Sequence, residues 1–267
     1  MSGILSETER ARYHRDGCVF PITLMAPHQA AAHRRRLEVA EAEQGPMHYR
    51  VKPYLFFTSA DEIARNARLL DAVGSLLGPD ILLWDSAYVI KEPHSGGHVT
   101  WHQDLTYWGL SADEVVTAWV ALSPVTPENG CMRFIPGSHE NGRLDHRDTH
   151  AADNILHRGQ EIAIAADEER AVDIPLAPGQ ASLHHGWVVH GSAPNGSDER
   201  RIGLTLQYLT PRVRQTLTDR ESATLVRGED RFGHFRPEPR CERDFDPVGM
   251  AFQREVEQLK HEVYDTA

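Results

Sequence analysis

The chain is poor in cysteine and has no long apolar run, and each of these absences removes a class of protein. Its cysteines are Cys18, Cys131 and Cys241, which lie far apart and form no Cys-x-x-Cys pair. An odd number at such spacing supports neither a disulfide framework nor a thiolate zinc site. No apolar stretch approaches the length of a membrane span, and the start of the chain shows no hydrophobic signal segment. We therefore expect a cytoplasmic protein that does not enter a membrane.

Positive charge and the common catalytic motifs are also scarce. The 28 Lys and Arg residues against 39 Asp and Glu give a net charge of −11, so nucleic acid is not an expected partner. The sequence has no GxGxxG, GxxxxGK[ST], HExxH or GxSxG, the patterns of nucleotide-binding loops, zincins and nucleophile elbows. By contrast, 16 histidines are an unusual number, and they direct attention to metal ligands.

The order of sequence patterns indicates one domain in three parts. Residues 1–79 have a helical character, residues 80–212 are a β core, and residues 213–267 are a loop followed by a helix. A capping box at Ser6 and Glu9 starts the first helix. Further helices are expected at 26–44, 61–77 and 247–264, and strands at 81–90, 115–122, 131–135, 162–165, 181–190 and 202–209. A run of strands without long helices between them predicts a mainly β sandwich or jelly roll, with the helices flanking it.

The pattern His-x-Asp occurs at residues 14–16, 102–104 and 146–148. The first lies at the end of the expected first helix, where residues two apart point in divergent directions and cannot easily share one ion. The third lies in a polar stretch that we interpret as a loop, without the packing that fixes metal ligands. Only the second pattern lies at the edge of a strand and between aromatic residues, which makes it the candidate for a metal site.

On an extended backbone, His102 and Asp104 point to the same face, so one strand can offer an imidazole and a carboxylate to a single ion. A third ligand has to come from another segment. A second strand-like stretch closes at His190, just before a glycine. His184 and His185 within that stretch are alternatives for the same role, and we favour His190 because of the residues that follow it.

Two neutral imidazoles and one carboxylate form the facial triad of non-haem Fe(II) oxygenases, which leaves three coordination positions open. If an oxo-acid fills two of them, O2 can take the last. The far carboxylate of the oxo-acid then needs a bidentate cation, and arginine suits this role. Arg201 opens the next strand, and antiparallel pairing through the turn at 195–197 is expected to bring it next to His190. Arg200 would face the opposite side.

These residues resemble the phytanoyl-CoA dioxygenase-like (PhyH-like) family of Fe(II)/2-oxoglutarate-dependent oxygenases. The resemblance covers roughly half of the chain in detail. Its segments are Trp101–Trp108, Val116–Leu122, Glu128–His139, His190–Asn195 and Arg201–Gly203.

The resemblance implies a double-stranded β-helix with His102, Asp104 and His190 on Fe(II). It also implies that Arg201 holds the distal carboxylate of 2-oxoglutarate. Other residues that match co-substrate positions of the family are Ser192, Gln103 and Trp119. Because halogenating members replace the metal carboxylate with a small residue, the presence of Asp104 implies hydroxylation or a related oxidation.

The expected reaction consumes O2 and 2-oxoglutarate, releases succinate and CO2, and oxidises a C–H bond of a small-molecule substrate. Candidate substrate residues are Tyr107, Trp108 and Phe134, although each of these aromatic side chains could equally serve packing. His184 and His185 are expected to be strand residues with satisfied hydrogen bonds. Two alternatives stay open: a cupin-like isomerase or hydrolase that does not use 2-oxoglutarate, and a non-catalytic module that binds a small molecule.

Overall fold

The computed structural model describes residues 4–150, 153–156, 159–163 and 167–264. The helices are α1 (Glu7–Asp16), α2 (Pro27–Gln44), α3 (Thr58–Ala64), α4 (Ala67–Leu77) and α5 (Pro247–Tyr264). Short 3₁₀ turns are η1 (Pro53–Leu55), η2 (Asp104–Thr106), η3 (Ser138–Asn141) and η4 (Glu168–Arg170). The strands are β1 (Cys18–Thr23), β2 (Ile81–Lys91), β3 (Val99–His102), β4 (Val115–Ala121), β5 (Met132–Phe134), β6 (His146–Asp148), β7 (Gln160–Ile162), β8 (Val172–Ile174), β9 (Gln180–His185), β10 (His190–Ser192), β11 (Arg201–Leu209), β12 (Ser222–Arg227) and β13 (Arg236–Pro237).

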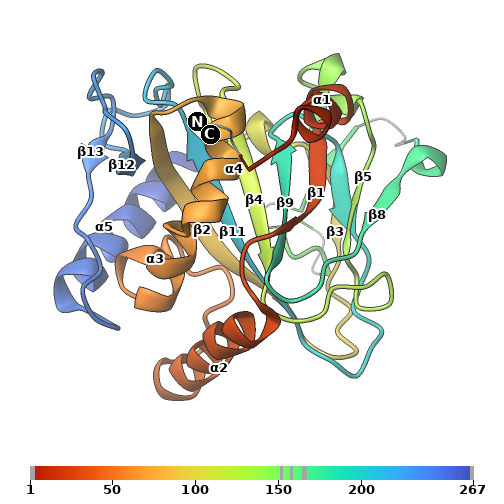
Figure 1. The fold of residues 1–267 in the computed structure, drawn as a ribbon, viewed down its shortest axis with the longest axis horizontal. Coiled ribbons are helices and arrows are strands. Elements are labelled where there is room, and N and C mark those ends of the chain that lie inside the picture. Colours follow the sequence, from red (N-terminus) through yellow and green to blue (C-terminus); the bar gives the residue numbers. More distant parts are fainter. Residues whose placement is uncertain (1–3, 151–152, 157–158, 164–166, 265–267) are drawn as a thin grey trace.

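The strands form a larger sheet in the order β1-β9-β4-β11-β2-β12-β13 and a smaller one in the order β3-β10-β5-β8, while β6 pairs with β7. In Figure 1 the helices α2 to α5 gather on one side of the molecule, and β3, β5 and β8 lie on the other. Every residue of β4 is buried, because helices cover one face of the larger sheet and the smaller sheet faces the other. The predicted fold class, a mainly β jelly roll with flanking helices, is confirmed. None of the described helices combines the length and the apolar character that crossing a membrane requires.

The N-terminal part is less helical than the sequence predicts. The chain leaves α1 through Gly17, which has a φ of 76°, and then forms β1, an outer strand of the larger sheet paired with β9. The single helix expected at 61–77 is two helices, α3 and α4. Asn66 causes the break, because its side chain accepts hydrogen bonds from the backbone of Arg68 and Leu69 and so caps a new helix.

The strand expected at 181–190 is also divided, and this matters for the site. β9 ends at His185, a turn follows, and His190 begins β10 in the smaller sheet. Gly186 permits the turn to pass close to Leu105, since a Cβ at this glycine would lie 2.4 Å from the leucine Cγ. As a result, His184 and His190 belong to different sheets.

Three other expectations need adjustment. Residues 146–148 are a short strand rather than a loop, because β6 pairs with β7. The strand expected at 162–165 ends at Ile162 in β7, and its last two residues fall outside the described residues. The C-terminal part contributes β12, which extends the larger sheet beside β2, in addition to the predicted helix.

Alternate residues of β2, β4 and β11 face the smaller sheet, and residues that pair across these strands form rows on that face. Arg201 of β11 pairs with Lys91 of β2, and six residues further on Gln207 pairs with Asp85 of β2 and Thr117 of β4. With a rise of about 3.3 Å per residue, the Arg201–Lys91 pair lies roughly 20 Å along the strands from the row formed by Thr117, Gln207 and Asp85. A cavity of about 270 Å³ lies along this face, between the two sheets.

Candidate metal centre and its cavity

His102, Asp104 and His190 meet at the centre of the cavity, as the sequence predicts. His102 ends β3 and pairs directly with His190 of β10, and Gln103 between the first two residues is extended. Oδ1 of Asp104 lies 3.4 Å from Nε2 of His102 and 3.6 Å from Nε2 of His190. The three donor atoms all lie within 4.8 Å of one another, so a single cation can contact all of them.

Both imidazoles are held in the orientation that a metal ligand needs. Nδ1 of His102 lies 2.9 Å from the Thr100 carbonyl oxygen, and Nδ1 of His190 lies 3.1 Å from that of Val188. A carbonyl can only accept, so Nδ1 carries the proton in each ring and Nε2 keeps its lone pair toward the cavity.

The carboxylate is oriented by its second oxygen. Oδ2 of Asp104 accepts a hydrogen bond from Thr117 at 3.1 Å and lies 3.3 Å from Nε2 of His184. These contacts leave Oδ1 directed at the two histidines of the triad. The carboxylate is therefore arranged to bind an ion through one oxygen.

The protonation states also suit a cation. Burial, together with the neighbouring His102, lowers the pKa of His190 to about 3, so this imidazole is neutral at physiological pH. Burial alone would raise the pKa of Asp104, but the surrounding histidines hold it well below its usual range. Two imidazoles whose Nδ1 atoms are fixed by backbone carbonyls and one ionised carboxylate fit the donor set of Fe(II).

Arg201 and Lys91 form a cross-strand pair at one end of β11 and β2, and both are almost fully buried. Nη1 of Arg201 donates to the Gly130 carbonyl at 2.6 Å, while its Nε is buried without a hydrogen-bond partner. Nζ of Lys91 donates to Oγ of Ser192 at 2.7 Å and to the Ser192 and Ala193 carbonyls. Among the described residues, no carboxylate forms an ion pair with either cation.

The route that brings Arg201 to the site differs from the prediction. Arg201 and His190 are not on paired neighbouring strands, because β11 belongs to the larger sheet and β10 to the smaller one. Arg201 instead packs on Trp119, a cavity-lining residue of β4, with its guanidinium carbon 5.2 Å from the ring centroid.

Ser192, Trp119 and Gln103 all line the cavity, but the side-chain amide of Gln103 is occupied by backbone contacts. Its Nε2 donates to the carbonyls of Gly142 and Trp187, and its Oε1 accepts from the backbone of Leu144. The amide holds two loops together behind the metal centre. We therefore do not carry Gln103 forward as a co-substrate ligand.

Of the three candidate substrate residues, two line the cavity and one does not. Tyr107 and Trp108 line the cavity. Phe134 is fully buried and packs against the rings of His184 and His190, with centroid distances of 5.0 and 5.7 Å. Phe134 therefore supports the metal ligands from behind.

Sequence reasoning missed three residues of the site. Lys91 could have been found from the sequence, because it follows the strand expected at 81–90 and continues its alternation of inward-facing residues. His184 was expected to be an ordinary strand residue with satisfied hydrogen bonds, yet its Nε2 faces Asp104 and its Nδ1 is buried without a partner. Tyr49 lies in an irregular segment with a φ of 55°, lines the cavity, and has its phenol pKa raised to about 12 by burial. No periodicity indicated Tyr49.

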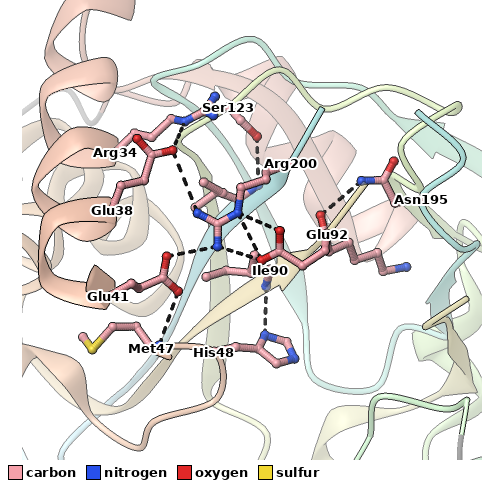
Figure 2. Close-up of polar contacts among 12 residues, drawn as sticks. Arg34, Glu38, Glu41, Met47, His48, Ile90, Glu92, Ser123, Asn195 and Arg200 are labelled. Carbon is pink, nitrogen blue, oxygen red and sulfur yellow. Dashed lines mark hydrogen bonds and ion pairs between the residues drawn. The ribbon is translucent and has the colours of Figure 1, made fainter. Parts of the chain in front are cut away.

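A cluster of charged residues holds the Tyr49 segment in place from the outer face of the sheet (Figure 2). We define the Arg200 cluster as Arg200, which directly precedes β11, with Glu38, Glu41 and Glu92. The guanidinium lies 2.7 Å from Glu92 and 3.0 Å from Glu41, and Glu38 is 3.9 Å away. As predicted, Arg200 faces away from the cavity.

The same region fixes the backbone on either side of Tyr49. Glu41 accepts a hydrogen bond from the backbone of Met47 at 3.4 Å, and Nδ1 of His48 accepts one from Ile90 at 3.0 Å (Figure 2). The Arg200 cluster thus joins α2, β2 and β11 to the segment that closes the Arg201 end of the cavity.

A family model for phytanoyl-CoA dioxygenase (PhyH) matches residues 4–203. The chain belongs to the PhyH family. The resemblance expected from the sequence motifs is thereby confirmed, and the triad of this PhyH-family chain lies within the matched region. Fe(II) and 2-oxoglutarate are the cofactor and co-substrate of such oxygenases, in agreement with the donor set described above.

Individual relatives agree with this placement. The chain is 32% identical over 159 residues to a probable alpha-ketoglutarate-dependent hypophosphite dioxygenase of Stutzerimonas stutzeri. This alignment covers 58% of this chain and 54% of that protein. It is 39% identical over 140 residues to phytanoyl-CoA dioxygenase domain-containing protein 1 of Danio rerio, over 50% of this chain and 46% of the relative. The alignments thus span about half the length of these curated relatives.

A solved structure covers the chain more completely. The apo structure of a non-heme monooxygenase, ThoJ, is 36% identical and superimposes with a TM-score of 0.85 over 96% of this chain and 97% of that one. The PhyH-family chain therefore shares the whole architecture of a non-heme monooxygenase, including the helices around the β core.

Proposed function

We propose that this chain is an Fe(II)- and 2-oxoglutarate-dependent dioxygenase. It hydroxylates, or otherwise oxidises, an unactivated C–H bond of a small molecule and releases succinate and CO2. The observation that carries the proposal is the metal triad in a cavity that Ser192 and Trp119 also line, with buried Arg201 packed on Trp119 and without a carboxylate partner among the described residues. Family membership supports the same conclusion. A cytoplasmic location stays a prediction from the sequence.

Buried Arg201 explains why the co-substrate should be a dicarboxylate. A buried charge without a partner costs several kcal/mol, about 3–5 kcal/mol when one member of a buried pair is removed. Burial and the neighbouring charge of Arg201 lower the pKa of the Lys91 ammonium group. An anion bound beside these two side chains would pair with Arg201 and favour the charged form of Lys91. An oxo-acid with a second carboxylate would reach from Arg201 to the triad.

Each residue then has a defined task. His102, Asp104 and His190 would hold Fe(II), which when bound supplies the power to activate O2 and oxidise the substrate. Arg201 would pair with the distal carboxylate. Because Lys91 donates to Oγ of Ser192, the serine hydroxyl keeps its own hydrogen for the same carboxylate.

The residues around the cavity would fix the approach of the substrate. Trp119 and Tyr49 line the cavity near Arg201. Tyr107 and Trp108 line it as well, and Trp108 packs against Trp84. Thr117 and His184 hold Oδ2 of Asp104, so Oδ1 would be the oxygen left to bind a metal.

The test adds 2-oxoglutarate to the Fe(II)-loaded protein without oxygen and records the visible metal-to-ligand charge-transfer absorption. We expect the band in the wild type and its loss in Arg201→Met at co-substrate concentrations that saturate the wild type. The control is Arg212→Met, which removes an exposed guanidinium that pairs with Glu114 outside the cavity. Asp104→Ala should abolish succinate formation coupled to substrate oxidation.

Two results would contradict the proposal. Metal-replete wild type without the band does not bind 2-oxoglutarate at iron, and full coupled turnover in Asp104→Ala shows that the triad is not the metal site. A cupin-like enzyme would retain its activity in Arg201→Met, and a binding module would release no succinate with any small molecule.

A further inference from the structure

The end of the cavity opposite Arg201 carries a charged pair that the proposed iron and 2-oxoglutarate chemistry does not use. Asp85 of β2 and Lys260 of α5 both line the cavity and form an ion pair with each other. The two side chains are 21% and 20% exposed, so they lie between the interior and the solvent. Along β2, Asp85 is the third inward-facing position beyond Lys91.

The backbone is irregular at the point that places Asp85. β2 and β11 pair regularly as far as Gln207 with Asp85, but the next pair is Tyr208 with Leu83. Trp84 is therefore an extra residue, a β-bulge. Bulges of this kind are common beside active sites, where they redirect a side chain.

Aromatic rings surround the charged pair. Trp84 packs edge-on against Trp108, with ring centroids 5.3 Å apart, and Nζ of Lys260 lies 5.9 Å from the centroid of Trp84. Apolar walls around a few polar groups are typical of small-molecule sites. They also reduce the solvent screening of both charges.

The pair is within reach of the metal centre. Thr117, Gln207 and Asp85 occupy one row across three adjacent strands, and a spacing of about 4.8 Å between strands makes this row roughly 10 Å long. Thr117 holds Asp104 of the triad at 3.1 Å. A molecule a few bonds long that is seated on Asp85 and Lys260 would therefore present its far carbon atoms to the metal.

We propose that Asp85 and Lys260 are the substrate-binding pair and that the substrate is a small zwitterion of the amino-acid type. Its ammonium group would pair with Asp85 and its carboxylate with Lys260. A ligand with a single charge would leave one member of the pair partly buried without a partner, which is costly. A molecule that carries both charges on neighbouring atoms replaces both contacts. The cavity of about 270 Å³ must also hold 2-oxoglutarate, so the substrate has to be small.

This inference rests on the proposed function, and its test separates the two. The probes are the common L-amino acids, each compared with its N-acetyl and carboxamide derivatives. They are added to the protein loaded with Fe(II) and 2-oxoglutarate, first without oxygen to record a shift of the charge-transfer band, then in air to measure succinate. At least one free amino acid should shift the band and raise succinate formation about tenfold, with its single-charge derivatives about tenfold weaker.

A response only to single-charge or neutral compounds, or no response to any zwitterion, would overturn the inference while the band before the addition still supports the proposed function. If that band is absent from the start, the proposed function fails first. Band shift and succinate release in the wild type do not depend on the folding of any variant.

Variants then assign the effect to the pair. Asp85→Asn and Lys260→Met should each raise the concentration for half-maximal response about tenfold or more, with the 2-oxoglutarate band retained. The matched control is Glu255→Gln, which removes another ion pair of α5, with Arg236 at 3.5 Å, outside the cavity. If Asp85→Asn and Lys260→Met respond like this control, the pair only anchors α5, and the inference is wrong.

Discussion

At the scale of single residues, burial in the fold changes the protonation chemistry of Lys91. Burial, with a further contribution from the charge of Arg201, lowers the pKa of its ammonium group to about 6. The lysine therefore loses its proton at a much lower pH than an exposed lysine does. A carboxylate favours the charged form, so co-substrate binding raises this pKa and takes up a proton.

The resulting prediction concerns the pH dependence of 2-oxoglutarate binding. Between the higher pKa of the complex and the value of about 6 in the free protein, affinity should increase as pH falls, by up to about tenfold per pH unit. Calorimetric titration of the Mn(II)-loaded protein with 2-oxoglutarate, in buffers of different ionisation enthalpy, measures the proton uptake directly. Lys91→Met should bind about tenfold more weakly or worse and show a flatter profile. Wild-type binding without proton uptake at pH 7.5 would contradict the assignment.

At the scale of the strand, a glycine in β11 makes room for the wall of the co-substrate site. A Cβ at Gly203 would lie 2.0 to 2.4 Å from three ring atoms of Trp119. The tryptophan ring therefore lies flat over this glycine, where Arg201 can stack on it. Neither strand propensity nor alternation reveals this requirement, because it arises from a cross-strand contact.

Gly203→Ala should displace Trp119 and thereby weaken both folding and co-substrate binding. We expect a loss of about 1–3 kcal/mol in the free energy of unfolding, as for other overpacked sites, and about tenfold weaker 2-oxoglutarate binding. Denaturant unfolding and the charge-transfer titration measure the two effects. Gly96→Ala is the control, since a Cβ there would meet nothing within 4 Å. Equal behaviour of the two variants would show that the ring does not depend on Gly203.

The Arg200 cluster acts at the scale of whole elements, because it joins α2 to the ends of β2 and β11 (Figure 2). Its guanidinium side chain is 23% exposed, so solvent screens part of the attraction, and Arg200→Met should cost only about 1 kcal/mol in stability. The effect on the backbone around Tyr49 should be larger than the effect on the stability of the whole protein. Amide hydrogen exchange should increase in residues 46–52, and the apparent affinity for 2-oxoglutarate should fall about threefold. Unchanged exchange in this segment would show that other contacts hold Tyr49.

At the scale of the molecule, the sequence predicts which side chains form the site better than it predicts how the fold brings them together. The triad could be predicted because the spacing of His102 and Asp104 is a local property of an extended chain. Arg201 was identified by type and order, but its expected hairpin with His190 was wrong, since the turn at Gly186 moves His190 to the other sheet. Lys260 could not be predicted at all. It reaches the cavity from α5 through a packing arrangement that no local pattern encodes.

The same global view predicts how the protein responds to loss of its metal. The core clusters are built from apolar residues of the helices and both sheets, and the triad ties only β3 and β10 together. Chelation should therefore leave the fold intact but less stable. An ion present at about 100 times its dissociation constant adds about 2.7 kcal/mol of stability, which for a domain of this size corresponds to a rise of roughly 5–10 °C in Tm.

Thermal unfolding with EDTA, and after addition of Fe(II) under anaerobic conditions or of Mn(II), measures this difference. Asp104→Ala should lose the metal-dependent rise. His14→Gln should keep it, because His14 belongs to a His-x-Asp pattern at the end of α1 that lies outside the triad. Asp104→Ala also removes a buried anion, so its metal-free Tm is compared first. A metal-dependent rise that survives in Asp104→Ala would place the stabilising ion elsewhere and would separate metal binding from the cavity that the two sheets enclose.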